Sequence, residues 1–116
     1  MGLVGTYSQN EKAIGGNGTN TTFVSQKVPR GQTVEITYAS VIDYTTKNKK
    51  LELGIRDATN TDVYLKSVQE SSTFGISIDT PIMLYEGESL IGVVEATTTS
   101  DALHFSVHGK RFSKVV

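Results

Sequence analysis

The sequence predicts an all-β protein, an antiparallel β-sandwich of the jelly-roll kind with about eight strands. Three observations support this prediction. Apolar and polar residues alternate along several short segments, turn-forming residues separate these segments every 10–12 residues or so, and no window has apolar residues at helical spacing over three turns. Hydrophobic residues are 37% and charged residues 20% of the 116 residues, which is typical of one globular domain.

The strand candidates follow from period-two alternation. In the segment 34–42, Val34, Ile36, Tyr38, Ser40 and Ile42 fall on one parity, and the segments 51–56, 74–79 and 103–108 alternate in the same way. Segment 63–68 is apolar on both faces, and segment 89–96 is nearly continuously apolar, which favours a central strand covered on both sides. Segments 22–28 and 3–7 are weaker strand candidates. The alternation predicts an inward-facing set: Val34, Ile36, Leu53, Ile55, Ile76, Val94, Phe105 and Val107.

Turn-forming residues lie between the predicted strands. Pro29 and Gly31 occupy favoured positions of a turn over residues 28–31, and Gly87 lies in a second turn over residues 85–88. The polar segment 58–62 is a third corner. These turns predict that the strands end at the same places where the apolar alternation stops.

The first 22 residues differ from the rest, because they are rich in glycine and asparagine and carry only two charges, Glu11 and Lys12. Such a segment cannot form a core of its own. We therefore expect residues 1–22 to be an N-terminal arm, either flexible or docked on a neighbouring subunit, and residues 23–116 to be the sandwich domain. The candidate inter-subunit anchors of this arm are Leu3, Val4, Tyr7 and Ile14.

Charge and cysteine content restrict the partners and cofactors. The formal net charge is −1, so no nucleic-acid or membrane partner is expected. The chain has no cysteine, which excludes disulfides and thiolate ligands. Residues 1–22 lack the basic start and apolar stretch of a signal peptide.

No residue pattern predicts an active site, and we expect no enzyme activity, no cofactor and no metal. His104 and His108 share the polar parity of the last strand, where about 13 Å separates them, too far for two ligands of one metal. We interpret both as surface residues. Glu86, Glu88, Asp79 and Asp101 could in principle serve a glycosidase or hold calcium, but their positions favour a role in turns.

The order of features resembles small β-sandwich proteins of tailed-phage virions, the cement, decoration and fibre-associated modules. The resemblance spans roughly residues 22–112: a polar opening, the turn at Pro29 and Gly31 leading into a long strand, the segment 84–90, and a last strand ending at 107–110. It implies a non-enzymatic virion protein made in the host cytoplasm, which forms homo-oligomers or binds a capsid lattice through protein–protein contacts. The alternative is a module that binds carbohydrate or another ligand on loops at one end of the sandwich.

Overall fold

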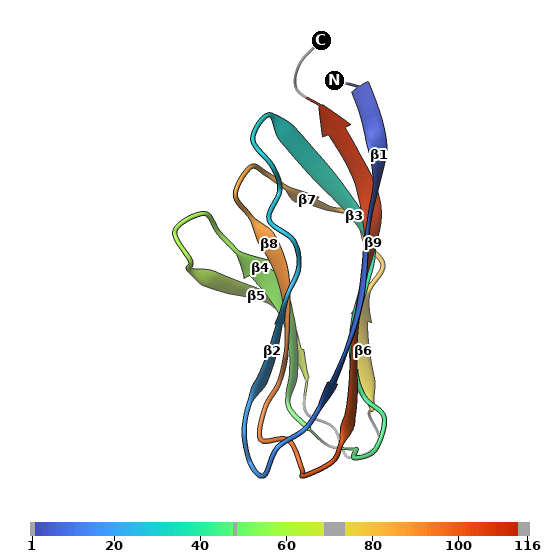
Figure 1. Ribbon diagram of the computed structural model, residues 1–116, viewed down its shortest axis with the longest axis vertical. Helices are drawn as coiled ribbons and strands as arrows, with labels where there is room; N and C mark the ends of the chain where they lie inside the picture. The colour runs from blue at the N-terminus through green and yellow to red at the C-terminus, as the bar shows by residue number, and fades with distance from the viewer. Residues whose placement is uncertain (1, 48, 69–73, 114–116) are drawn as a thin grey trace.

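The computed structural model describes residues 2–47, 49–68 and 74–113. Within them the chain forms strands and no helix, so no helix is present that could cross a membrane. The strands build two antiparallel sheets that pack face to face in an elongated molecule of 48 × 25 × 20 Å (Figure 1). Their bounds are β1 Gly2–Ile14, β2 Thr21–Val24, β3 Gln32–Asp43, β4 Leu51–Arg56, β5 Asp62–Val68, β6 Gly75–Ile78, β7 Ile82–Leu84, β8 Ser89–Val94 and β9 Ala102–Ser113.

The strand order is that of a jelly roll. The first sheet, here called the five-stranded sheet, has the order β1-β9-β3-β6, with β7 also paired to β3; the four-stranded sheet has the order β2-β8-β4-β5. Strands β6 and β7 pair with consecutive stretches of β3 and therefore share one position in the sheet. Eight positions in two four-membered layers with Greek-key connections define this architecture. The predicted all-β antiparallel sandwich is confirmed.

The core lies between the two sheets. The Phe23 and Phe105 rings stack across it, with centroids 5.4 Å apart and planes 5° from parallel, and so join β2 of one sheet to β9 of the other. Gly92 lies beside Phe105, and a Cβ there would come within 2.7 Å of that ring. The predicted inward-facing residues are buried, with the exception of Ile55, which is partly buried and packs against the margin of the core.

A β-bulge in β3 changes the face on which its later residues lie. The pairing of β3 with β9 shifts register between Ile36 and Tyr38, so Thr37 is the extra residue. Val34 and Ile36 point into the core before the bulge, whereas Ala39 and Val41 do so after it. The expectation that Tyr38, Ser40 and Ile42 share the face of Val34 is therefore wrong, and these side chains lie on the outer face of the sheet.

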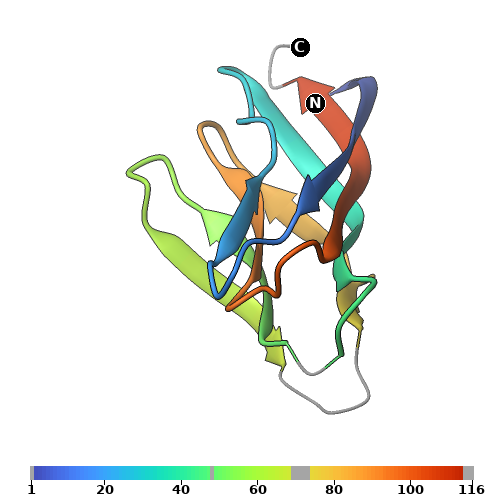
Figure 2. The ribbon, with the colours of Figure 1, turned by 60° about the horizontal axis from the view of Figure 1, so that its bottom comes forward.

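The structure also corrects the predicted arm. Residues 2–14 form β1, the edge strand of the five-stranded sheet, which pairs with β9 from Gly2↔Ser113 to Ile14↔Ala102. Residues 21–24 form β2 in the opposite sheet. The boundary drawn at residue 22 is therefore wrong, because both segments belong to the sandwich. Figure 2 shows β1 running alongside β9 and continuing into β2 across one end of the molecule.

The predicted turns close the strands as expected. Gln32 N donates to Pro29 O at 3.2 Å across a turn in which Gly31 has φ 81°, and Glu88 N donates to Tyr85 O at 3.0 Å across a turn in which Gly87 has φ 82°. A positive φ of this size is readily adopted only by glycine.

Candidate functional site

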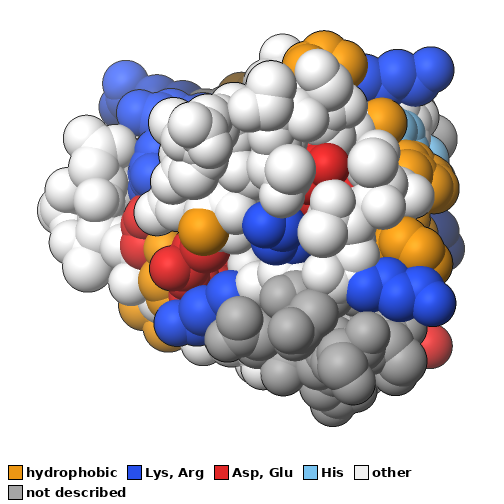
Figure 3. Space-filling model, turned by 90° about the horizontal axis from the view of Figure 1, so that it is seen from below, with side chains coloured by type: hydrophobic (Ala, Val, Ile, Leu, Met, Phe, Trp, Pro, Cys, Tyr) orange, Lys and Arg blue, Asp and Glu red, His pale blue; other side chains and the backbone are white. Residues whose placement is uncertain are grey.

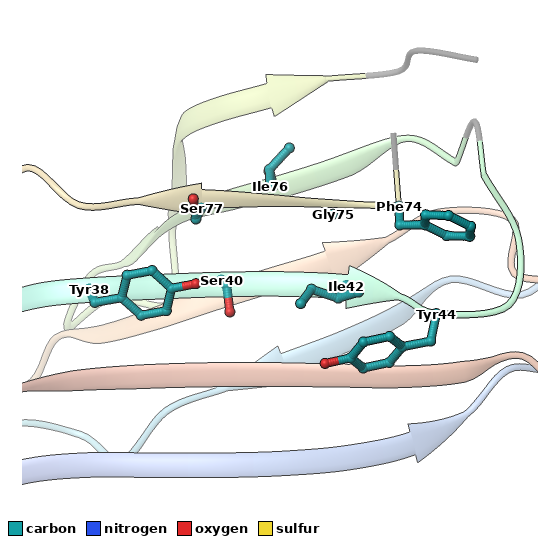
Figure 4. Close-up of a pocket in the computed structure, with 8 residues that line it drawn as sticks. All are labelled: Tyr38, Ser40, Ile42, Tyr44, Phe74, Gly75, Ile76 and Ser77. Carbon is teal, nitrogen blue, oxygen red and sulfur yellow. The ribbon is translucent and has the colours of Figure 1, made fainter. Parts of the chain in front are cut away.

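The outer face of the five-stranded sheet has an open depression of about 470 Å³, here called the tyrosine face. Tyr38 on β3 and Tyr44, directly after the end of β3, lie at its two ends, and the rise of a strand separates their Cα atoms by about 20 Å. In Figure 4 the Tyr38 ring lies over β3 and the Tyr44 ring lies toward the neighbouring β9, and their hydroxyl groups turn toward the stretch between them. The depression is lined by Tyr38, Ser40, Ile42, Tyr44, Phe74, Gly75, Ile76 and Ser77.

Local backbone features create this depression. The bulge at Thr37 places Tyr38, Ser40 and Ile42 on the outer face, as described above. Gly75 pairs with Ile42, and a Cβ at position 75 would come within 2.7 Å of Ile42 Cγ1. Any larger residue there would displace Ile42 or fill the floor. The bulge and the glycine together leave a hollow between aromatic side chains.

The polar groups of the tyrosine face are hydroxyls. Among the described residues, the side-chain hydroxyls of Tyr38, Ser40, Tyr44 and Ser77 have no hydrogen-bond partner, although Ser40 is only 3% exposed. Buried polar groups are normally paired with protein or water. The depression therefore offers unpaired donors and acceptors but no charged side chain.

Two histidines flank the tyrosine face on β9. The His108 ring lies 6.3 Å from that of Tyr38, and the His104 ring lies 6.2 Å from that of Tyr44. His108 Nδ1 is also hydrogen-bonded to Ser8 Oγ at 2.9 Å. Both histidines are half-buried on the outer face, so they are surface residues that pack beside the tyrosines. Figure 3 shows hydrophobic side chains gathered with histidine along this side of the molecule.

A second exposed feature is the outer edge of the four-stranded sheet, here called the β5 edge: Val63, Tyr64 and Leu65. These three consecutive large apolar residues are 56%, 45% and 48% exposed. Among the described residues, strand β5 pairs only with β4, and the turn between these strands projects sideways from the body (Figure 1). Contiguous exposed apolar residues of this kind are typical of protein contact sites.

The fold also brings together two carboxyl pairs that the sequence did not predict. Burial, the hydrogen bond with Glu95 and the charge of Glu95 raise the pKa of Glu52 to about 7. Glu95 in turn lies 3.4 Å from Lys50 Nζ. Burial and a hydrogen bond with Asp101 raise the pKa of Asp43. The sequence feature that could have indicated the first pair is Glu52, a carboxylate within the strand candidate 51–56.

The predicted anchors fall into two groups. Tyr7 is 4% exposed and belongs to the core of its own domain, where its hydroxyl donates to Ser25 Oγ at 2.6 Å and to the Gln26 carbonyl. Its proposed role as an inter-subunit anchor is therefore wrong. Leu3, Val4 and Ile14 are exposed along β1. They remain candidates for contact with another chain.

Three of the acidic residues considered for chemistry have local roles. Glu86 Oε1 accepts a hydrogen bond from Gly31 N at 2.8 Å, and Glu88 Oε1 accepts one from Tyr85 N at 2.7 Å. Asp101 Oδ1 accepts one from Thr46 Oγ1 at 2.8 Å. Within residues 2–47, 49–68 and 74–113, no three His, Cys, Asp or Glu side chains lie together as metal ligands would.

No protein-family model matches the chain, and no curated protein matches it significantly. Among solved structures, the chain is similar to the core of Drosophila NLP, with 13% identity, a TM-score of 0.46, and 95% of this chain and 100% of that chain covered. It is also similar to the pre-peptidase C-terminal domain of a Bacillus anthracis collagenase, with 14% identity, a TM-score of 0.48 and 86% of each chain covered. The globular domain of zebrafish complement 1qA has 13% identity, a TM-score of 0.43 and 94% coverage of each chain. At such low TM-scores these similarities establish no relationship.

Proposed function

We propose that this protein is a non-enzymatic assembly domain that associates with a second copy of itself through the β5 edge. The observation that supports this proposal is the exposure of Val63, Tyr64 and Leu65 on a strand with one free side. Burial of such side chains against a partner is favourable in proportion to the apolar area removed from water. In an isolated molecule these three side chains stay exposed to water, so the favourable free energy of burying them is not obtained.

The charges around the β5 edge suit a second copy. Asp62, which pairs with Arg56 at 2.8 Å, precedes the three apolar residues, and Lys66, whose Nζ donates to the Ser77 carbonyl at 3.0 Å, follows them. In a two-fold antiparallel contact centred on Tyr64, Asp62 of each copy faces Lys66 of the other, and Val63 faces Leu65. Opposite charges then meet at both ends of an apolar centre, an arrangement that gives orientation and specificity.

The contact is expected to depend on side chains more than on a continued sheet ladder. The pairing of β4 with β5 shifts register between Leu53 and Gly54, where Leu65 is the extra residue of β5. Bulges and lysines limit uncontrolled strand addition at sheet edges. The bulge and Lys66 therefore disfavour an extended sheet between copies but still allow a two-fold contact between the side chains of the β5 edge.

The finer form of the proposal is that the assembly is a tailed-phage virion, in which the protein is a cement or decoration subunit made in the host cytoplasm. The resemblance in sequence features supports it, and jelly rolls occur in viral capsid domains, although they also occur in lectins. Electron microscopy of a tailed-phage capsid incubated with the protein tests this. Density at symmetry-related lattice positions supports the cement role, and a bare lattice contradicts it.

Two experiments test self-association through the β5 edge. Native mass spectrometry of the wild type is expected to show a dimer that Tyr64→Asp abolishes, because two aspartates would meet on the two-fold axis. Tyr85→Asp is the matched control, since Tyr85 is 55% exposed, lies in a turn and is remote from β5 in sequence. A wild type that stays monomeric at every concentration would refute the proposal.

Cross-linking tests the centre of the contact. The chain has no cysteine, so Tyr64→Cys introduces one thiol per copy. Oxidation should give a disulfide-linked dimer, because residues on the axis lie within the about 4.4–6.8 Å between Cα atoms that a disulfide spans. Tyr85→Cys should not cross-link. A native dimer without the Tyr64→Cys cross-link would place the interface elsewhere.

A further inference from the structure

We propose that the tyrosine face is a binding site for a neutral oligosaccharide, which lies along β3 between Tyr38 and Tyr44. This inference is independent of self-association through β5. It concerns the opposite sheet, and it rests on the rings, the hydroxyls and the absence of charge in the depression.

The shape of the site favours an extended ligand. The depression is open to solvent, and the Cα atoms of its two tyrosines lie about 20 Å apart along the strand direction, with the side chains turned toward each other. A chain of several sugar units is long enough to extend along this stretch and contact both rings. Sugar rings have flat C–H faces that pack on aromatic side chains, and exposed tyrosine supplies a large rigid contact surface at low conformational-entropy cost. Figure 4 shows the rings of Tyr38 and Tyr44 at opposite ends of this stretch, with their hydroxyl groups turned toward each other.

The polar groups of the site match sugar hydroxyls. Each of the hydroxyls of Ser40, Ser77 and the two tyrosines can donate and accept a hydrogen bond, as a sugar hydroxyl does. The Ser40 hydroxyl is the most informative of them, because Ser40 lines the depression, is only 3% exposed as a residue, and its hydroxyl has no hydrogen-bond partner among the described residues. A ligand hydroxyl would satisfy it.

The uncharged lining of the site argues against a charged ligand. None of the eight lining residues is charged, so the site has no group that would select a phosphate, a carboxylate or an ammonium. Two lysines contact the margin of the lining: Lys66 Nζ donates to the Ser77 carbonyl at 3.0 Å, and Lys47 Nζ lies 5.0 Å from the centroid of the Phe74 ring. That contact places Lys47 against an aromatic ring at the margin of the depression. A neutral sugar is the ligand that this chemistry selects.

Isothermal titration with soluble hexasaccharides tests the proposal, using the full chain with cellohexaose, maltohexaose, laminarihexaose and chitohexaose as probes. We expect at least one to bind the wild type, and Tyr38→Ala and Tyr44→Ala each to weaken that binding by about tenfold. Tyr38→Phe, which keeps the ring, should lose only a few-fold. Tyr85→Ala, an exposed tyrosine outside the face, should bind as the wild type does.

Several results would overturn the proposal. Binding of none of the four sugars would do so, as would binding that survives both alanine substitutions, or binding of a proline-rich peptide in place of every sugar. Circular dichroism of each variant must match the wild type, so that loss of binding is not loss of folding. Tyr64→Asp should leave sugar affinity unchanged, which separates this proposal from that of self-association.

Discussion

Substitution of Tyr7 tests whether β1 is an integral strand of the sandwich or an arm that the fold does not need. The ring of Tyr7 is buried in the core, and its hydroxyl bonds to Ser25 Oγ and the Gln26 carbonyl, so that β1 of one sheet is joined to the segment after β2 of the other. Tyr7→Ala should lower the free energy of unfolding by about 3–5 kcal/mol, as for other buried aromatic residues. Tyr7→Phe should cost about 1–2 kcal/mol, because it leaves the buried acceptors short of one donor.

The assay is urea unfolding followed by circular dichroism, with Leu3→Ala as the control. Leu3 lies on the same strand but is 63% exposed, so its replacement should change the stability by less than about 0.5 kcal/mol. Tyr7→Phe is the decisive variant if Tyr7→Ala does not fold, since a domain has only about 5–15 kcal/mol of stability. A cost below about 0.5 kcal/mol for Tyr7→Phe and below about 1 kcal/mol for Tyr7→Ala would refute the integral role of β1.

Three further predictions concern the rest of the molecule. Because the pKa of Glu52 is raised to about 7, the folded state favours its protonated form, so stability should fall as the pH rises from about 4.5 through 7; Glu52→Gln should flatten that fall in a urea titration. Phe105→Ala should cost about 3–5 kcal/mol by removing a fully buried ring from its stack, measured by chemical denaturation, and a cost below about 1 kcal/mol would contradict the core assignment. Replacing both His104 and His108 with Gln should leave the melting temperature almost unchanged, since both lie on the outer face; loss of a bound metal in that variant would show a role the structure does not suggest.

The alternation of β9 shows why much of the core could be predicted. Leu103, Phe105 and Val107 are all buried, because β9 has no bulge between them and its neighbours lie on both sides. A period of two in sequence is then a period of two in space. The same argument holds for Leu51 and Leu53 in β4.

The tyrosine face could not be predicted, because one extra residue reverses every side chain that follows it. The alternation assigned Tyr38 and Ile42 to the same face as Val34, but the bulge at Thr37 moved them to the outside. The partner of a bulge lies on another strand, here at His108 and Gly109 of β9. No local pattern in residues 34–42 contains that information.

Strand β1 was predicted only in part, as the weak strand candidate 3–7, for a related reason. Most of its side chains are exposed, and of its residues only Tyr7 is buried, so its sequence lacks the apolar alternation of a central strand. Its stability comes from pairing along β9, a segment about a hundred residues away in sequence. The glycine- and asparagine-rich composition that suggested an arm is compatible with an edge strand, which needs little apolar surface of its own.

The sequence by itself determined the fold class, the principal turns and most of the core, because these follow from local alternation and from backbone preferences of glycine and proline. The tertiary structure alone decided which strands are edges, where the bulges lie and therefore which aromatic residues are exposed. Tyr7 and Tyr38 illustrate the difference: the first was predicted to anchor a neighbouring subunit and is buried in its own domain, and the second was placed on the face of Val34 and lines the outer face. Each outcome depends on pairing between residues distant in the chain, and that pairing is fixed only when the whole sandwich closes.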